Sequence, residues 1–161
     1  MAALNLAVPS FTITLPSNDR TTQPQPKTLA RADYSLQMAP LIDMVQQGQC
    51  WELTLASIEF YNATPGGTAV FINVSLVRGT RVGSAVVDLL YRIPGSALTT
   101  VGMIHYIPRE VGGLFTAAIS DLGTARRVEV SLTNAQGNVV SMNGAGAEND
   151  TFVTITFRRC G

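Results

Sequence analysis

The sequence predicts an all-β fold built from short antiparallel strands. Apolar side chains recur with a period of two residues, and turn-forming residues separate the apolar runs at short intervals. In addition, no long stretch has a convincing helical period. Eight or nine short strands in about 150 residues suit a β-sandwich, a jelly roll or a Greek-key barrel.

Five segments carry the clearest strand pattern, because β-branched and aromatic residues alternate in them with polar ones. They are residues 10–15, 51–60, 70–76, 128–132 and 152–157. Weaker strands are predicted at 34–38, 84–93, 101–107 and 114–119, and short helical turns remain open within 84–92 and 109–121. Turns are predicted at 16–19, 46–49, 65–67, 94–96, 112–113 and 134–138.

One face of each alternating segment is expected to fill the core of the sandwich. Trp51, the only tryptophan, begins a strand and is predicted to lie in this core rather than to form a binding platform. The predicted core consists of Phe11, Ile13, Leu15, Trp51, Leu53, Leu55, Ile58, Ile72, Val74, Val130, Leu132, Val153, Ile155 and Phe157.

The length of 161 residues suits one domain with a substantial core, since a chain of this mass buries roughly 69% of its surface on folding. We expect a single β-sandwich (jelly-roll) domain over residues 10–159, with an N-terminal tail at 1–9 and a C-terminal tail at 160–161. The polar, proline-bearing stretch at 17–28 is predicted to be a loop within this domain.

The composition is unusually poor in charge. Eleven basic and eleven acidic residues give a net charge of zero, and charged residues make up 14% of the chain, against about 25% in a typical soluble domain. The mean hydropathy is +0.22. Either neighbouring molecules cover part of the surface, or the exposed surface consists largely of the uncharged polar residues Ser, Thr, Asn and Gln. We favour a covered surface.

These numbers exclude several classes of protein. Binding to nucleic acid through phosphates needs a basic excess, which the chain lacks. No apolar run reaches the length of about 18 residues that a membrane span needs. The first nine residues lack the basic region of a signal peptide, so we expect a chain made in a cytosol-like compartment and not secreted.

Catalytic and metal-binding residues are scarce. His105 is the only histidine, and we expect a strand residue with its ring half exposed rather than a catalytic base. One histidine and two cysteines cannot form a metal cluster without carboxylates, and a calcium site at residues 143–150 is not expected. Cys50 and Cys160 are predicted to be free thiols, although a disulfide stays open.

Arginine dominates the basic residues, with ten Arg and only Lys27. Arginine forms bidentate pairs with carboxylates and is frequent at protein interfaces, although a GC-rich genome also explains the bias. Neighbours on a strand point to opposite faces, so one member of each adjacent pair is a candidate interface residue. The candidate interface residues are Arg126, Arg127, Arg158 and Arg159.

Several segments in a fixed order resemble a known family. Residues 11–18 read F-T-I-T-L-P-S-N, residues 34–43 read Y-S-L-Q-M-A-P-L-I-D, and residues 48–60 read G-Q-C-W-E-L-T-L-A-S-I-E-F. Residues 128–132, V-E-V-S-L, precede the Gln136-Gly137 turn and the terminal strand F-V-T-I-T-F-R-R at 152–159. This order resembles the penton-like and minor capsid proteins of eukaryotic double-stranded DNA viruses, in the large-virus and polinton-like groups. The similarity covers roughly the first third and the last quarter of the chain.

The resemblance implies a single jelly roll that forms a homopentamer or packs under a capsid, without enzymatic activity or cofactor. Its partners would be further copies of the chain and neighbouring capsid proteins, in a virion assembled in the host cytoplasm or nucleus. The alternatives are a β-sandwich binding module for carbohydrate or receptor, and a capsid protein that wraps nucleic acid. An enzyme is the least favoured reading.

Overall fold

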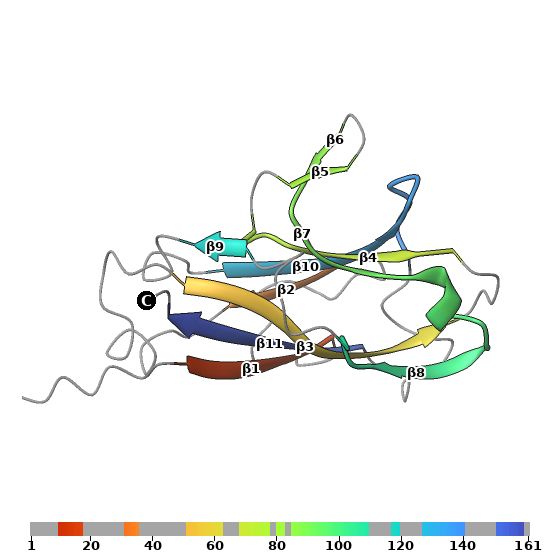
Figure 1. Cartoon of the computed structure of the whole chain (residues 1–161), viewed down its shortest axis with the longest axis horizontal. Helices are drawn as coiled ribbons and strands as arrows, with labels where there is room; N and C mark the ends of the chain where they lie inside the picture. Colours follow the sequence, from red (N-terminus) through yellow and green to blue (C-terminus); the bar gives the residue numbers. More distant parts are fainter. Residues whose placement is uncertain are drawn as a thin grey trace, which may run out of the picture.

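Two antiparallel sheets face each other in a computed structural model of the chain, which describes residues 10–17, 31–35, 51–62, 68–77, 80–82, 85–109, 117–119, 127–140 and 151–159 (Figure 1). The first sheet has the order β1-β11-β3-β8, and the second has the order β2-β10-β4-β7. The short strand β9 pairs with the end of β3 that β8 leaves free, and β5 and β6 form a separate ribbon.

The strand bounds are as follows: β1 Ser10–Pro16, β2 Arg31–Ser35, β3 Trp51–Asn62, β4 Val70–Val74, β5 Thr80–Val82, β6 Ala85–Val87, β7 Leu89–Ile93, β8 Gly102–Tyr106, β9 Ala117–Ile119, β10 Arg127–Asn134 and β11 Phe152–Arg159. One 3-10 turn, η1, spans Gly95–Ala97 in the stretch predicted to be a turn.

The strand order defines a jelly roll. When β5, β6 and β9 are left out, the remaining eight strands pair first with eighth, second with seventh, third with sixth and fourth with fifth. The chain therefore follows the path of one long hairpin that is rolled into two sheets. This confirms the predicted all-β antiparallel sandwich of about eight strands with only a short helical turn.

The core lies between the two sheets and contains most of the predicted residues. Phe11 and Ile13 are partly buried and pack against it; the other twelve predicted core residues are buried. Phe11 stacks on Phe157 with 4.7 Å between ring centroids and meets Trp51 edge-on at 5.3 Å. Further buried members of the core are Phe60, Val70, Val77, Leu90, Ile93, Leu98 and Val128.

A β-bulge in β3 explains why Leu55 and Ile58 both point into the core although they are three residues apart. The partner register passes from Thr154 opposite Ser57 to Ile155 opposite Leu55, so one extra residue enters β3 at this point. The bulge moves the inward positions from odd to even numbers, and both halves of this long strand face the core.

The turn after β10 lies where the sequence predicts it. The Asn134 side-chain Oδ1 accepts hydrogen bonds from the backbone N–H groups of Gln136 at 3.0 Å and Asn138 at 2.9 Å. Gly137 has φ of +79°, a conformation that residues with a side chain rarely adopt. This local chemistry ends the strand.

Some strand limits differ from the prediction. β2 spans Arg31–Ser35 rather than 34–38, because its pairing with β10 sets its position. β4 ends at Val74 because the Val77 N–H turns back to its carbonyl. The segment 84–93 divides into β6 and β7 around Asp88 and contains no helical turn in its described part. Most of 109–121 and of the loop 17–28 lies outside the described residues.

Candidate functional site

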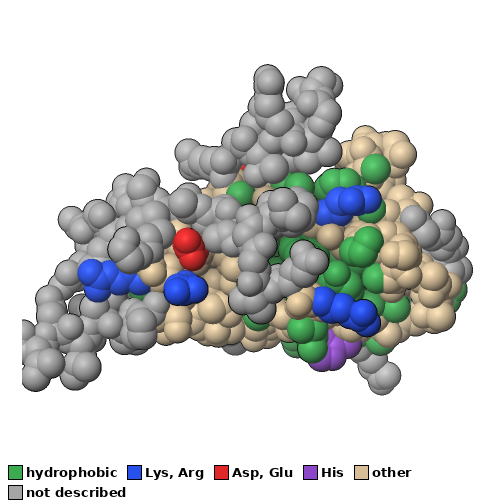
Figure 2. All heavy atoms as spheres, in the orientation of Figure 1, with side chains coloured by type: hydrophobic (Ala, Val, Ile, Leu, Met, Phe, Trp, Pro, Cys, Tyr) green, Lys and Arg blue, Asp and Glu red, His purple; other side chains and the backbone are tan. Residues whose placement is uncertain are grey.

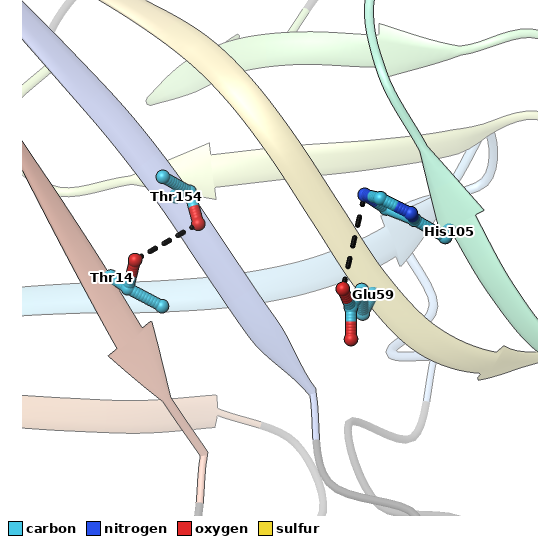
Figure 3. Close-up of polar contacts among 4 residues, drawn as sticks. All are labelled: Thr14, Glu59, His105 and Thr154. Carbon is cyan, nitrogen blue, oxygen red and sulfur yellow. Dashed lines mark hydrogen bonds and ion pairs between the residues drawn. The ribbon is translucent and has the colours of Figure 1, made fainter.

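The outer face of the first sheet is lined with hydroxyl groups on β1 and β11, at one edge of the sheet. β1 and β11 each carry a Thr-x-Thr sequence, and the antiparallel register places these threonines side by side. The Oγ1 atoms of Thr12 and Thr156 are 3.0 Å apart. Those of Thr14 and Thr154, which Figure 3 shows, are 3.1 Å apart. Because the hydroxyl groups bond to one another, this part of the face is polar and uncharged.

Towards β8 the same face carries a histidine and a glutamate side by side. His105 of β8 lies opposite Glu59 of β3, with 3.8 Å between Nε2 and Oε1 (Figure 3). The side chains are 56% and 45% exposed, respectively. His105 is thus a strand residue with a half-exposed ring, as predicted.

Three large apolar side chains are exposed like His105: Met103 lies within β8, and Val101 and Ile107 lie directly before and after it. Val101 is 56% exposed, Met103 47% and Ile107 58%. These three residues and His105 form a row on the outer face, which we call the β8 row. In Figure 2 the histidine (purple) lies at the lower edge of the view, with apolar side chains (green) beside it.

β8 is also an edge strand. It stands at the end of the first sheet, and among the described residues its backbone ladder runs only to β3. Edge strands are normally protected by charged side chains, prolines or bulges, which prevent pairing with other chains. Between residues 101 and 107 the sequence V-G-M-I-H-Y-I has no Lys, Arg, Asp, Glu or Pro. The strand is therefore open to pairing along one side.

A buried asparagine holds the corner that leads into β8. Asn62, at the end of β3, is 6% exposed, and its Nδ2 donates to the carbonyl oxygens of Thr100 at 2.8 Å and Leu98 at 3.4 Å. These bonds fix the stretch between η1 and β8 against β3. The sequence pattern did not single out Asn62, because its partners are more than 30 residues away.

β8 is anchored across the sandwich as well. The hydroxyl groups of Tyr91 on β7 and Tyr106 on β8 lie 3.3 Å apart, with ring centroids separated by 6.0 Å. The two strands are edges of different sheets, so this contact ties the sheets together on one side. The inner side chains of β8 thus fix its position, while its outer row remains exposed.

The structure does not bring the predicted interface arginines together. Arg158 and Arg159 are exposed at the end of β11 in the first sheet, whereas Arg127 begins β10 in the second. Arg158 lies opposite Glu52 in the register of β11 with β3. Arg126 falls outside the described residues.

Two further findings concern metal binding and membranes. No group of three or more His, Cys, Asp or Glu that could hold a metal ion occurs there. No helix in that part is long and apolar enough to span a membrane. Cys50, Cys160 and residues 143–150 lie outside it.

Comparison with known proteins identifies no family. No family model matches the chain, and no curated protein matches its sequence. Among solved structures it is similar to the virus-like particle of the extra small virus of the giant freshwater prawn Macrobrachium rosenbergii, determined by cryo-EM. The TM-score is 0.30 and the identity 9%, over 92% of this chain and 77% of that one. The strand order therefore defines the fold, and the exposed residues of the surface are the basis for a function.

Proposed function

We propose that the chain is a structural virion protein, a penton or minor capsid component that assembles through protein–protein interfaces in an icosahedral capsid and has no catalytic activity. The jelly roll supports this proposal, because viral capsid proteins commonly use this architecture. The observation that carries it is the exposure of large apolar side chains in a chain with few charges. They are Val101, Met103, Ile107, Val139 and Phe152, each 38–58% exposed.

Two other roles of jelly rolls have less support. Carbohydrate-binding modules commonly present exposed aromatic side chains, whereas Trp51 is fully buried between the sheets. Catalytic zinc sites use about three protein ligands, often histidines, and the chain has a single histidine. An assembly role needs neither feature.

The proposed partners are further copies of the chain, in a homopentamer, and neighbouring capsid proteins. A net charge of zero argues against direct binding of nucleic acid, since phosphate neutralisation needs a basic excess. The proposed location is the virion, with assembly in the host cytoplasm or nucleus. Membership of the penton-like family of double-stranded DNA viruses stays a prediction.

Size-exclusion chromatography with multi-angle light scattering tests the proposal. At micromolar concentration we expect an assembly, and a mass of five times the 17.2 kDa chain identifies a penton. A stable monomer across this range contradicts an obligate assembly role. Retention on a glycan array would favour the binding module, and salt-dependent binding of nucleic acid would contradict the proposed partners.

A further inference from the structure

We propose that β8 pairs with β8 of a second copy of this chain, antiparallel and around a two-fold axis at Ile104. This inference rests on the proposed self-association and names one of its contacts. An isologous interface requires a surface that complements itself after a rotation of 180°. Residues 101–107 have this property on both faces of the strand.

The outer face of the strand is self-complementary in polarity. With the axis at Ile104, Val101 lies opposite Ile107 of the second copy, so that two side chains exposed by 56% and 58% cover each other. Met103 lies opposite His105 of the second copy and packs on the ring, while Nε2 remains directed to Glu59. Each exposed apolar residue of the β8 row thereby gains a partner.

The inner face is self-complementary in size. Gly102 lies opposite Tyr106 of the second copy, and Ile104 meets its own equivalent. A Cβ atom built on Gly102 meets no atom within 4 Å, so the space beside this residue is open. The largest side chain of the strand thus faces the position that has none.

The lack of charged side chains and the backbone groups at the edge also favour a second copy of β8 as the partner. The row has no acidic, Lys or Arg side chain between residues 101 and 107, so an identical row does not repel it. The edge of β8 that pairs with no other described strand offers backbone N–H and C=O groups that a second antiparallel strand can pair with. Pairing joins the first sheets of two copies into one continuous sheet.

The size of the contact indicates its role. A pairing of five-residue strands is smaller than the roughly 1,200–2,000 Å² of a standard interface, so it is weak by itself. Where other interfaces already hold copies close together, a weak contact is strengthened by the high effective concentration. We therefore assign the β8 pair to a link between copies that belong to adjacent parts of a larger assembly.

Disulfide trapping of mixed single-cysteine variants tests the register. Val101→Cys and Ile107→Cys are made in a background with Cys50→Ser and Cys160→Ser, mixed after reduction, and oxidised. Opposed residues of an antiparallel pair have Cα atoms about 4.5–5.5 Å apart, within the range of about 4.4–6.8 Å that a disulfide spans. Two copies of Val101→Cys would be six residues out of register, about 20 Å apart.

We expect a disulfide dimer in the mixture, at least tenfold more than in either variant alone, with peptide mapping that joins positions 101 and 107. Met103→Cys mixed with His105→Cys repeats the test at a second pair of outward positions. The matched control is Thr14→Cys, an exposed position on β1 at the opposite edge of the same sheet, mixed with Ile107→Cys.

The light-scattering mass of the background protein separates the two proposals. An assembly whose mixtures crosslink no better than the control overturns the β8 pair and leaves the proposed function intact. A crosslinked pair in a protein that is otherwise only a dimer supports the contact and contradicts the penton. A monomer without crosslinks overturns both.

Discussion

Replacement of Asn62 by aspartate tests how the structure positions β8. The amide Nδ2 donates to the Thr100 carbonyl at 2.8 Å and to the Leu98 carbonyl at 3.4 Å. The residue is only 6% exposed. Asn62→Asp keeps the shape but turns the donor into an acceptor that faces two carbonyl oxygens. The carboxylate oxygen that replaces Nδ2 then faces these two carbonyl oxygens and cannot donate to them.

The expected cost follows from these contacts. The shorter bond is worth about 0.5–1.5 kcal/mol net, and a buried charge left without a partner costs about 3–5 kcal/mol. We therefore expect the free energy of unfolding to fall by about 3–5 kcal/mol at pH 7. Burial raises the pKa of the introduced carboxyl above its unfolded value of about 3.9. The penalty is therefore absent below that pH and grows as the pH rises to the folded pKa.

The assay is urea unfolding followed by the fluorescence of Trp51, the only tryptophan, which is buried in the folded chain. Wild type and variant are compared at pH 3.5 and pH 7. Asn73→Asp is the matched control: its amide donates to the Thr133 hydroxyl at 3.0 Å and, at the longer distance of 3.5 Å, to the Ser131 carbonyl, and the Thr133 hydroxyl can rotate to donate to a carboxylate instead. We expect the control to lose less than about 1 kcal/mol. Equal losses for the two variants at pH 7, or a loss for Asn62→Asp that does not shrink at pH 3.5, would refute the reasoning.

Two further predictions concern buried polar groups. Ser17→Ala removes the Oγ acceptor of the Thr151 backbone N–H at 2.9 Å, with both residues fully buried, and is expected to cost about 1–3 kcal/mol in calorimetry. Ser10→Ala at the exposed start of the same strand should stay within about 0.5 kcal/mol. Trp51→Phe removes an indole N–H that has no partner among the described residues and should cost about 1 kcal/mol, against about 3–5 kcal/mol for Trp51→Ala. Equal shifts of the circular-dichroism melting curves of the two Trp51 variants would contradict this account.

Strands with strict alternation could be predicted from the sequence almost to the residue. In β1 and β11 each side chain takes its face from its position in the pleat, so local pattern and tertiary structure agree. The bulge in β3 also leaves a local signal, because Ala56-Ser57 separates two inward apolar residues where strict alternation expects one polar residue. These features depend only on neighbours along the chain.

Features set by distant partners could not be predicted in this way. The residues of β2 alternate no better than those that follow, and the register with β10, which places Tyr34 opposite Val128, decides where the strand lies. The role of Asn62 depends on carbonyl groups more than 30 residues away. The sequence of the β8 row has the pattern of an ordinary strand. Only the sheet order shows that this strand lies at an edge.

Apolar residues on the outer faces of the two sheets differ in exposure, and this difference bears on why the chain has so few charges. On the second sheet Phe71 and Leu89 are buried, although neither belongs to the core cluster between the sheets. On the first sheet Val101, Met103 and Ile107 of the β8 row are about half exposed. This exposed row lies on a strand with one backbone edge that pairs with no other described strand, and one antiparallel partner would bury the side chains and complete the ladder together.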